Sequence, residues 1–231
     1  MPICGTARRD VRHPGGRFFL PARGGVAPTE ARRRVTFAAI MLPVSFTAQP
    51  HEAGLDEAGR GCLAGPVFAA AVVLPPDFQA PGLTDSKLLS AKRREQLRDV
   101  ICREALTWAV AEASPDEIAS INIAQASYLA MHRAVAQLGL PPTHLAVDGN
   151  RFRAYPGIEH SCIIKGDGKY QNIAAASVLA KTFRDERMRD LAAEFPQYGW
   201  QQNAGYPTGQ HRAAIRQHGP TPHHRMGFRL L

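Results

Sequence analysis

The run from Val67 to Leu74 constrains the fold more than any other segment of this chain. It reads Val-Phe-Ala-Ala-Ala-Val-Val-Leu, without a polar side chain, and Pro75-Pro76 follows it directly. A strand with one wet face alternates apolar and polar residues, whereas a strand covered on both faces is apolar throughout. Proline ends such a strand because it lacks the backbone N–H that the sheet requires. The run therefore predicts a strand inside a sheet that is covered on both faces.

Other strands and helices alternate along the rest of the chain. Ser90 and Ser114 are typical helix N-caps, and Ser114-Pro-Asp-Glu adds proline at the first helical position and glutamate at the third. Five strands interleaved with helices predict an α/β layered domain, and an opening hairpin makes its sheet mixed. The predicted strands are one ending at Leu55, then 67–74, 106–113, 144–147 and 161–165; the predicted helices are 91–104, 115–137 with a break near Ile121-Asn122, 173–194 and 208–217, the last in an otherwise loop-rich C-terminal portion.

The cysteines and the apolar runs narrow the class of protein. Four cysteines are scattered, without a C-x-x-C pair or a Cys/His cluster, which favours reduced thiols in a cytoplasmic protein over disulfides or a zinc site. No apolar run approaches the roughly 18 residues that a membrane span needs. We therefore expect a cytoplasmic protein without a membrane segment. We also expect a monomer. The cysteines are Cys4, Cys62, Cys102 and Cys162.

The formal net charge of +8 belongs mostly to the N-terminal tail. Residues 1–50 contain eight arginines and two acidic residues, which leaves the remaining 181 residues close to neutral. We predict a disordered basic extension over 1–48; a transit peptide and a nonspecific nucleic-acid arm are the alternatives. Met41 is a possible true start, because ordered-looking sequence begins only near Pro50.

Four acidic residues are predicted at or just beyond strand ends. Asp56 and Glu57 follow the first strand, Asp148 the fourth and Asp167 the fifth. Carboxylates brought together at one sheet edge repel one another and need a positive ion among them. Oxygen ligands without His or Cys suit Mg²⁺ or Mn²⁺, and two such ions roughly 4 Å apart can hydrolyse a phosphodiester. For any single aspartate, a turn or helix-cap role remains the alternative.

The residues near these acids have plain structural interpretations as well. Gly59-Arg60-Gly61 can be a tight hairpin turn, although glycines also allow a ligand to approach the backbone. Tyr206 can be a packing residue in a loop, and Lys87 can be a solvated lysine. We further expect Asp185 to form an ion pair, His211 to pack locally and His223-His224 to be solvated. Ser177 and Asn122 can line a substrate groove, and Ser177 can equally be a small packing residue.

A series of ordered motifs resembles the ribonuclease HII family, a type 2 ribonuclease H. The resemblance runs from about residue 52 to 219, and residues 1–48 match nothing in it. The motifs are Gly54-Leu-Asp-Glu-Ala-Gly-Arg-Gly-Cys-Leu-Ala-Gly-Pro-Val67, Asp85-Ser-Lys-Leu-Leu-Ser90, Ile121-Asn-Ile-Ala-Gln-Ala126, Val147-Asp-Gly-Asn150, Lys165-Gly-Asp167, Ala174-Ala-Ala-Ser-Val-Leu-Ala-Lys181 with Arg184-Asp185, and Gly205-Tyr-Pro-Thr-Gly-Gln-His211.

The resemblance implies a ribonuclease-H-like fold, a five-stranded mixed sheet flanked by helices with a C-terminal helical portion. The catalytic domain would span 49–222 and a C-terminal tail 223–231. The resemblance implies that Asp56, Glu57, Asp148 and Asp167 are catalytic metal ligands for two Mg²⁺ or Mn²⁺ ions. It also implies that Gly59, Arg60 and Gly61 read the 2′-hydroxyl and the phosphate of a ribonucleotide, that Lys87 contacts phosphate, and that Tyr206 stacks on the next sugar.

The activity that the resemblance implies is endonucleolytic cleavage of RNA. The substrates would be RNA/DNA hybrids and DNA duplexes with single ribonucleotides, and the products would carry 3′-hydroxyl and 5′-phosphate ends. A related nuclease of the transposase or resolvase kind is one alternative, but a DNA-only enzyme needs no reader of the 2′-hydroxyl. A nucleic-acid-binding module without catalysis is another, and the complete acidic set argues against it.

Overall fold

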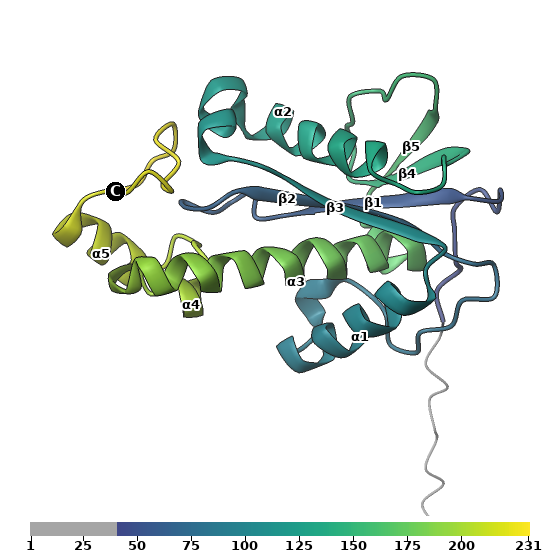
Figure 1. The fold of residues 1–231 in the computed structure, drawn as a ribbon, viewed down its shortest axis with the longest axis horizontal. Helices are drawn as coiled ribbons and strands as arrows, with labels where there is room; N and C mark the ends of the chain where they lie inside the picture. Colours follow the sequence, from purple (N-terminus) through teal and green to yellow (C-terminus); the bar gives the residue numbers. More distant parts are fainter. Residues whose placement is uncertain (1–40) are drawn as a thin grey trace, which may run out of the picture. The chain divides into compact units, whose positions relative to one another are not determined.

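A five-stranded mixed sheet lies at the centre of the computed structural model, which describes residues 41–231 (Figure 1). The strand order is β3-β2-β1-β4-β5. β1 and β3 run antiparallel to β2, which lies between them, whereas β4 and β5 run parallel to β1. The predicted mixed sheet is confirmed. The strands are β1 (Glu52–Ala58), β2 (Val67–Val73), β3 (Thr107–Ala113), β4 (His144–Asp148) and β5 (Glu159–Ile163).

Helices cover both faces of this sheet. In Figure 1, α2 (Pro115–Ala136) lies on one face, and α1 (Ala91–Glu104) and α3 (Gln171–Glu194) lie on the other. All seven residues of β2 are buried, as its apolar sequence predicts. The two core clusters divide accordingly, with Ala69 and Ala71 packed on the α2 side and Ala70 and Val72 on the α3 side.

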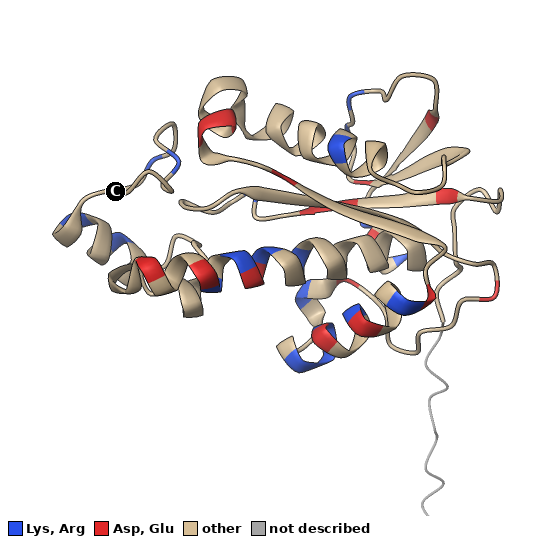
Figure 2. Ribbon diagram, in the orientation of Figure 1, with Lys and Arg blue, Asp and Glu red and all other residues tan. Residues whose placement is uncertain are grey.

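The capping residues in the sequence correctly predict where α1 and α2 begin. Ser114 forms a complete capping box with Glu117, and Ser90 caps α1. Asn122 has φ 67°, so the predicted break in α2 is confirmed. Figure 2 shows acidic and basic residues interleaved along α1 and part of α3. Ion pairs such as Arg98–Glu186, at 2.9 Å, join the two helices. No helix within residues 41–231 is long and apolar enough to cross a membrane.

Three predicted boundaries need correction. β1 does not end at Leu55 but continues to Ala58, so Asp56 and Glu57 lie inside the strand and pair with residues of β2. β5 begins and ends two residues earlier than the predicted 161–165. The C-terminal portion contains, besides α5 (Gly209–His218), the short helix α4 (Trp200–Asn203), which was predicted as loop. Short 3₁₀ turns occur at Ser86–Leu88, Gly166–Gly168 and Pro196–Tyr198.

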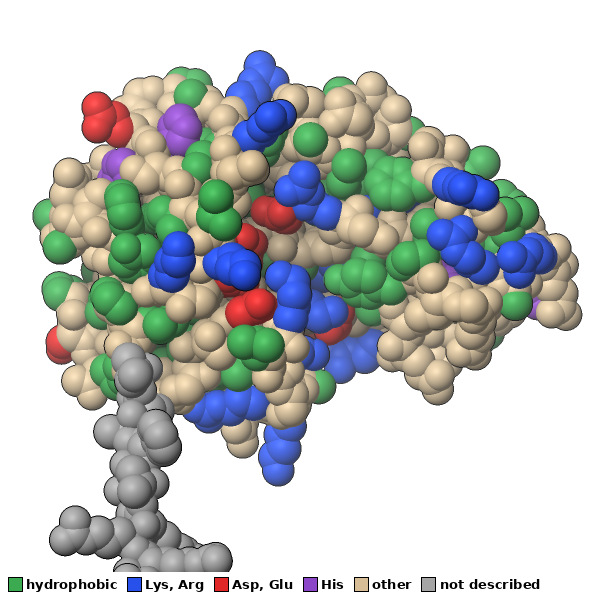
Figure 3. Space-filling view, turned by 180° about the vertical axis from the view of Figure 1, so that it is seen from behind, with side chains coloured by type: hydrophobic (Ala, Val, Ile, Leu, Met, Phe, Trp, Pro, Cys, Tyr) green, Lys and Arg blue, Asp and Glu red, His purple; other side chains and the backbone are tan. Residues whose placement is uncertain are grey.

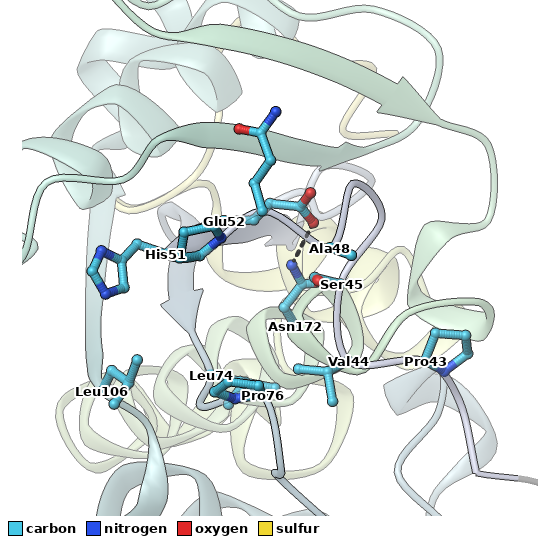
Figure 4. A pocket seen from close by; sticks show the side chains of 12 residues that line it. Pro43, Val44, Ser45, Ala48, His51, Glu52, Leu74, Pro76, Leu106 and Asn172 are labelled. Carbon is cyan, nitrogen blue, oxygen red and sulfur yellow. Dashed lines mark hydrogen bonds between the residues drawn. The ribbon is translucent and has the colours of Figure 1, made fainter.

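The segment just before β1 contacts the start of α3 and the first residue of β1. The carbonyls of Pro43 and Val44 accept the first N–H groups of α3, from Gln171 and Asn172. The buried Glu52 carboxylate accepts the Phe46 and Thr47 N–H groups, each at 2.7 Å, and the Asn172 side-chain amide at 2.9 Å. A cavity of about 440 Å³ adjoins this segment (Figure 4). Residues 1–40 of the predicted extension lie outside the described part of the chain.

The C-terminal residues are not a free tail. The Arg225 N–H donates to the Leu63 carbonyl and the Gly65 N–H to the His223 carbonyl, and residues 64 and 224 form a β-bridge. His224 is only 1% exposed, so the expectation that the histidine pair is solvated is wrong for His224. The reason is long-range, because the segment pairs with residues about 160 positions earlier.

Candidate active site

Three aspartates from separate segments meet at one edge of the sheet. Asp56 lies near the end of β1, Asp148 ends β4, and Asp167 lies in the 3₁₀ turn after β5. One carboxylate oxygen from each lies within 4.8 Å of the other two. Lys165 adopts a left-handed conformation, φ 56°, at the start of that turn, and the Gly166 N–H donates to the Asp148 carboxylate at 2.7 Å.

Glu57 is not one of these three residues, because adjacent residues in a strand point to opposite faces of the sheet. Asp56 pairs with Ala70, which belongs to the core on the α3 side. Glu57 pairs with Ala69, which belongs to the core on the α2 side. The Glu57 carboxylate instead binds Arg60 at 3.1 Å. Glu57 nevertheless lines the same cavity as Asp56 and Asp148.

The acidic cluster is electrostatically unfavourable by itself. Burial raises the pKa of Asp56 well above its usual value, and the charges of Glu57 and Asp148 raise it further. Burial, with the charges of Asp148 and Asp85, raises the pKa of Asp167 to about 6. Burial also raises the pKa of Glu57, although Arg60 opposes this. A cation within the cluster would remove this repulsion.

Basic side chains surround the acids. Burial of Lys87 favours its neutral form, but the carboxylates of Asp85 and Asp56 outweigh this effect and raise the lysine pKa. The Lys87 ammonium lies 3.7 Å from the Asp85 carboxylate. Figure 3 shows acidic side chains grouped near the middle of one face, with lysine and arginine side chains around them. An anion that reaches the acids would therefore first meet positive charge.

Eight of the nine predicted site residues line one cavity of about 320 Å³, and Asp167 is the exception. Ser86, Ser177 and Lys181 also line it, and the hydroxyl oxygens of Ser86 and Ser177 are 2.9 Å apart. Ser177 therefore faces the cleft, whereas Asn122 is an exposed residue at the kink of α2. The eight residues are Asp56, Glu57, Gly59, Arg60, Gly61, Lys87, Asp148 and Tyr206.

Glycine is required at position 59 of the turn for a steric reason. Its φ is +95°, and a Cβ there would lie 2.0 Å from the Arg184 Nε atom. Arg184 is fully buried and donates to the carbonyls of Pro66, Ala64 and Ala204 at 2.9–3.2 Å. It therefore connects α3 with both sides of the cleft.

A second buried arginine holds the other side of the same turn. Arg225 donates to the carbonyls of Arg60 and Gly65, each at 2.9 Å. It is 0% exposed, and among the ion pairs within residues 41–231 none includes it. Burial lowers its pKa to about 10. The Arg225 side chain thus stabilises the Gly59–Gly61 turn through the Arg60 carbonyl. No local feature of the sequence predicts this role.

The backbone of Tyr206 is hydrogen-bonded to the buried His211, which in turn contacts Trp200. The Tyr206 ring lies 5.4 Å from the Lys181 ammonium and 5.7 Å from the Arg184 guanidinium, and the residue is 38% exposed. Its carbonyl accepts the Nδ1–H of His211 at 2.9 Å, and His211 Nε2 accepts the Trp200 indole N–H at 2.9 Å. His211 therefore packs locally, as predicted. The predicted ion pair of Asp185 is also present, with Lys181 at 2.7 Å.

Comparison with known proteins identifies the family of this chain. The family Ribonuclease HII matches residues 53–231. Ribonuclease HII of Parabacteroides distasonis is 63% identical over 192 residues, which are 83% of this chain and 96% of that protein. Ribonuclease H2 from Pyrococcus horikoshii OT3 has a TM-score of 0.66 at 24% identity, covering 77% of this chain and 93% of that one.

A further structural relative is Bst-RNase HIII, solved in complex with Mn²⁺. Its TM-score is 0.64 at 18% identity, covering 78% of this chain and 68% of that one. At these identities the two structural likenesses concern the fold alone.

The mixed sheet with carboxylates at one edge defines a ribonuclease-H-like nuclease. The family match and the 63% identity specify which one. The chain belongs to the ribonuclease HII family and is an endoribonuclease that cuts RNA in RNA/DNA hybrids. Enzymes of this kind depend on a divalent metal ion.

Proposed function

We propose that this enzyme also incises DNA duplexes at single ribonucleotides, with two divalent ions held by Asp56, Glu57, Asp148 and Asp167. The observation that carries the proposal is the meeting of three aspartates, within 4.8 Å, beside the Gly59–Gly61 turn. A turn whose backbone faces the cleft can bind a 2′-hydroxyl, the group that distinguishes RNA from DNA. The cluster and the turn together would place the cut at a ribonucleotide.

The residues present fit a hard divalent cation. All the candidate ligand atoms are carboxylate oxygens, which suit Mg²⁺ or Mn²⁺. Burial and mutual repulsion raise the pKa values of Asp56 and Asp167, so a bound cation would stabilise their charged forms. When bound, such ions lower the pKa of water and stabilise the leaving oxygen of a phosphodiester. The Mn²⁺ complex of Bst-RNase HIII is consistent with this assignment in a similar fold.

The remaining site residues would bind and orient the substrate. Arg60 is half-exposed beside Glu57 and can bind the phosphate at the ribonucleotide. Lys87 is largely exposed above the acids and can hold a neighbouring phosphate. The Tyr206 ring, held by Lys181 and Arg184, would stack on the following sugar and favour a deoxyribose there. Products would carry 3′-hydroxyl and 5′-phosphate ends.

Asp56→Asn tests the metal assignment. The substitution keeps the shape of the side chain but removes its charge, so cleavage of an RNA/DNA hybrid should fall by roughly 100-fold or more. Circular dichroism and the thermal midpoint should show an intact fold. Glu104→Gln, an exposed acid at the end of α1, is the matched control and should cut like the wild type. Wild-type rates in Asp56→Asn would refute the assignment.

Tyr206→Ala tests the reading of a single ribonucleotide. Without its ring the enzyme should lose more activity on a DNA duplex with one ribonucleotide than on a continuous hybrid. Equal losses on the two substrates would count against this role. A binding module without catalysis would bind both substrates and cut neither. A resolvase-like enzyme would cut an all-DNA substrate equally well.

We further propose that the enzyme works as a monomer in the cytoplasm. In support, Cys62, Cys102 and Cys162 are free thiols in the described part of the chain, which suits a reducing compartment. Light scattering of the purified protein should give the mass of one chain. A stable dimer mass would overturn the monomer proposal.

A further inference from the structure

A second cavity, of about 830 Å³, adjoins the acidic cleft on the α2 side of the sheet. It shares Glu57, Arg60 and Asp148 with the cleft, so the two are continuous around the end of β1. Its far wall comes from α2, from the connection after β4 and from His160 and Cys162 of β5. None of the predicted site residues belongs to that far wall.

The connection after β4 presents two arginines to this cavity. Arg151 and Arg153 are exposed and line it, while Phe152 between them is partly buried. Neither arginine takes part in the ion pairs found within residues 41–231. Their guanidinium groups are therefore available to an anion from outside the chain.

Aromatic contacts hold this connection in place. The Phe152 ring lies 6.0 Å from Tyr128, 5.3 Å from His132 and 5.1 Å from His160, measured between ring centroids. His132 Nε2 lies 2.7 Å from the Arg153 carbonyl oxygen. The backbone that carries both arginines is thus anchored to α2 and β5. Binding a ligand therefore has to order the two side chains but not the backbone that carries them.

The charges that face the cavity favour an anionic polymer. Arg60, Arg151 and Arg153 are its cationic groups, and Glu57, one of its two acids, already pairs with Arg60. The other acid, Asp148, belongs to the aspartate cluster. Arginine binds phosphate oxygens through two parallel N–H groups, and successive phosphates along a strand can engage successive guanidiniums.

We propose that this cavity holds the sugar-phosphate backbone of the cut strand to one side of the cleavage site, with Arg151 and Arg153 on its phosphates. The cut strand is the occupant because the cavity opens directly onto Glu57 and Asp148. This inference rests on the proposed function, since it extends the same site. The aromatic wall then serves as the support for the arginines.

Salt dependence of binding tests the phosphate contacts. Arg151→Ala/Arg153→Ala is compared with the parent in the Asp56→Asn background with Mg²⁺, so that a fluorescent RNA/DNA hybrid is bound without being consumed. Each lost phosphate contact reduces the slope of log affinity against log salt by about 0.7–0.9, so the double variant should lose about 1.4–1.8. The control is Arg103→Ala, which changes an exposed arginine near the C-terminal end of α1 and should keep the parent slope. An unchanged slope in the double variant would overturn the inference.

Alkylation of Cys162 gives a second readout that needs no variant of the cavity. Cys162 is exposed and lines the cavity, whereas Cys102 is partly buried on α1 and serves as an internal control. Bound hybrid should slow maleimide labelling of Cys162 several-fold, measured by peptide mass mapping, and leave Cys102 unchanged. Equal labelling of Cys162 with and without bound hybrid would overturn the proposal.

Different results would overturn the proposed function and the cavity assignment. If wild-type protein neither binds nor cuts the hybrid, the proposed function itself is wrong. If wild-type protein cuts normally while the arginine variant keeps its salt slope and Cys162 stays reactive, only the cavity assignment is wrong. Thermal midpoints of the double variant should match the parent, because both side chains are exposed.

Discussion

At the residue scale, a cation among the three aspartates would relieve the repulsion between their charged forms. Mg²⁺ or Mn²⁺ should therefore stabilise the wild-type protein, by about 2.7 kcal/mol when the ion is at 100 times its dissociation constant. Asp56→Asn should lose most of this increase and, in chelator, should unfold no more easily than the wild type. The measurement is the thermal midpoint with and without the ion.

Glu104→Gln is the control for that experiment and should keep the full metal-induced increase. The metal assignment would be contradicted by an equal increase in Asp56→Asn, because a cation elsewhere on the protein would then cause the stabilisation.

His224 predicts a dependence of stability on pH. Its Nδ1 accepts the Thr221 N–H at 2.9 Å, its Nε2 lies 3.3 Å from His211 Nε2, and burial lowers its pKa to about 4. The folded state therefore holds it neutral. Its contribution to the free energy of unfolding is complete above the unfolded pKa of about 6.5 and is lost as pH falls towards 4, by up to about 1.4 kcal/mol per pH unit.

Urea unfolding of the wild type and of His224→Gln, each at pH 7.5 and pH 5, isolates this contribution. The variant should be less stable at pH 7.5, and the difference between the two proteins should shrink at pH 5. A difference that stays constant would show that His224 does not titrate as its surroundings require.

At the element scale, β1 and α3 approach so closely that only glycine fits between them. A Cβ at Gly54 would lie 2.2 Å from the backbone carbonyl carbon of Asn172, which cannot move aside as a side chain can. Gly54→Ala should lower the free energy of unfolding by about 3 kcal/mol. Gly139→Ala, where the nearest atom is 3.6 Å away, should change it little. Equal stability of the two variants in urea would contradict this packing.

Glu52, the first residue of β1, holds the segment that precedes the strand. Its buried carboxylate accepts hydrogen bonds from Phe46, Thr47 and Asn172, and a glutamine has only one acceptor oxygen to offer. Glu52→Gln should cost about 2 kcal/mol of stability in urea unfolding. Cleavage should stay at the wild-type rate below the unfolding range, because Glu52 lies about 13 Å along the strand from Asp56. Lost activity in a folded variant would contradict this separation.

At the scale of the whole molecule, patterns within one segment were predictable and contacts between distant segments were not. The apolar run 67–74 and the Ser114 capping box each carry their own signal, and both the buried strand and the helix start are confirmed. The sequence predicts the end of β1 at Leu55, because acidic residues are poor signals for a strand interior. With the strand ended at Leu55, the sequence does not predict that the side chains of Asp56 and Glu57 point to opposite faces of the sheet.

The supports of the site were harder to predict for the same reason. Arg225 and His224 resemble an ordinary polar terminus, and only their pairing with residues 60–65 buries them. A role for Arg151 and Arg153 could not be predicted from their own segment, because the cavity that they line is formed by α2, β4 and β5 together. Three of the four acids meet as predicted, but the part of each in binding a metal ion stays a prediction.

Cleavage of a DNA duplex that carries one ribonucleotide tests the central claim most directly. The strand is labelled at its end, and the wild-type protein is added with Mg²⁺ or Mn²⁺, or with a chelator. We predict a single cut at the ribonucleotide in either metal ion, with 3′-hydroxyl and 5′-phosphate ends, and no cut in chelator or in the matching all-DNA duplex. Cleavage that persists in chelator, or equal cleavage of the all-DNA duplex, would contradict the account.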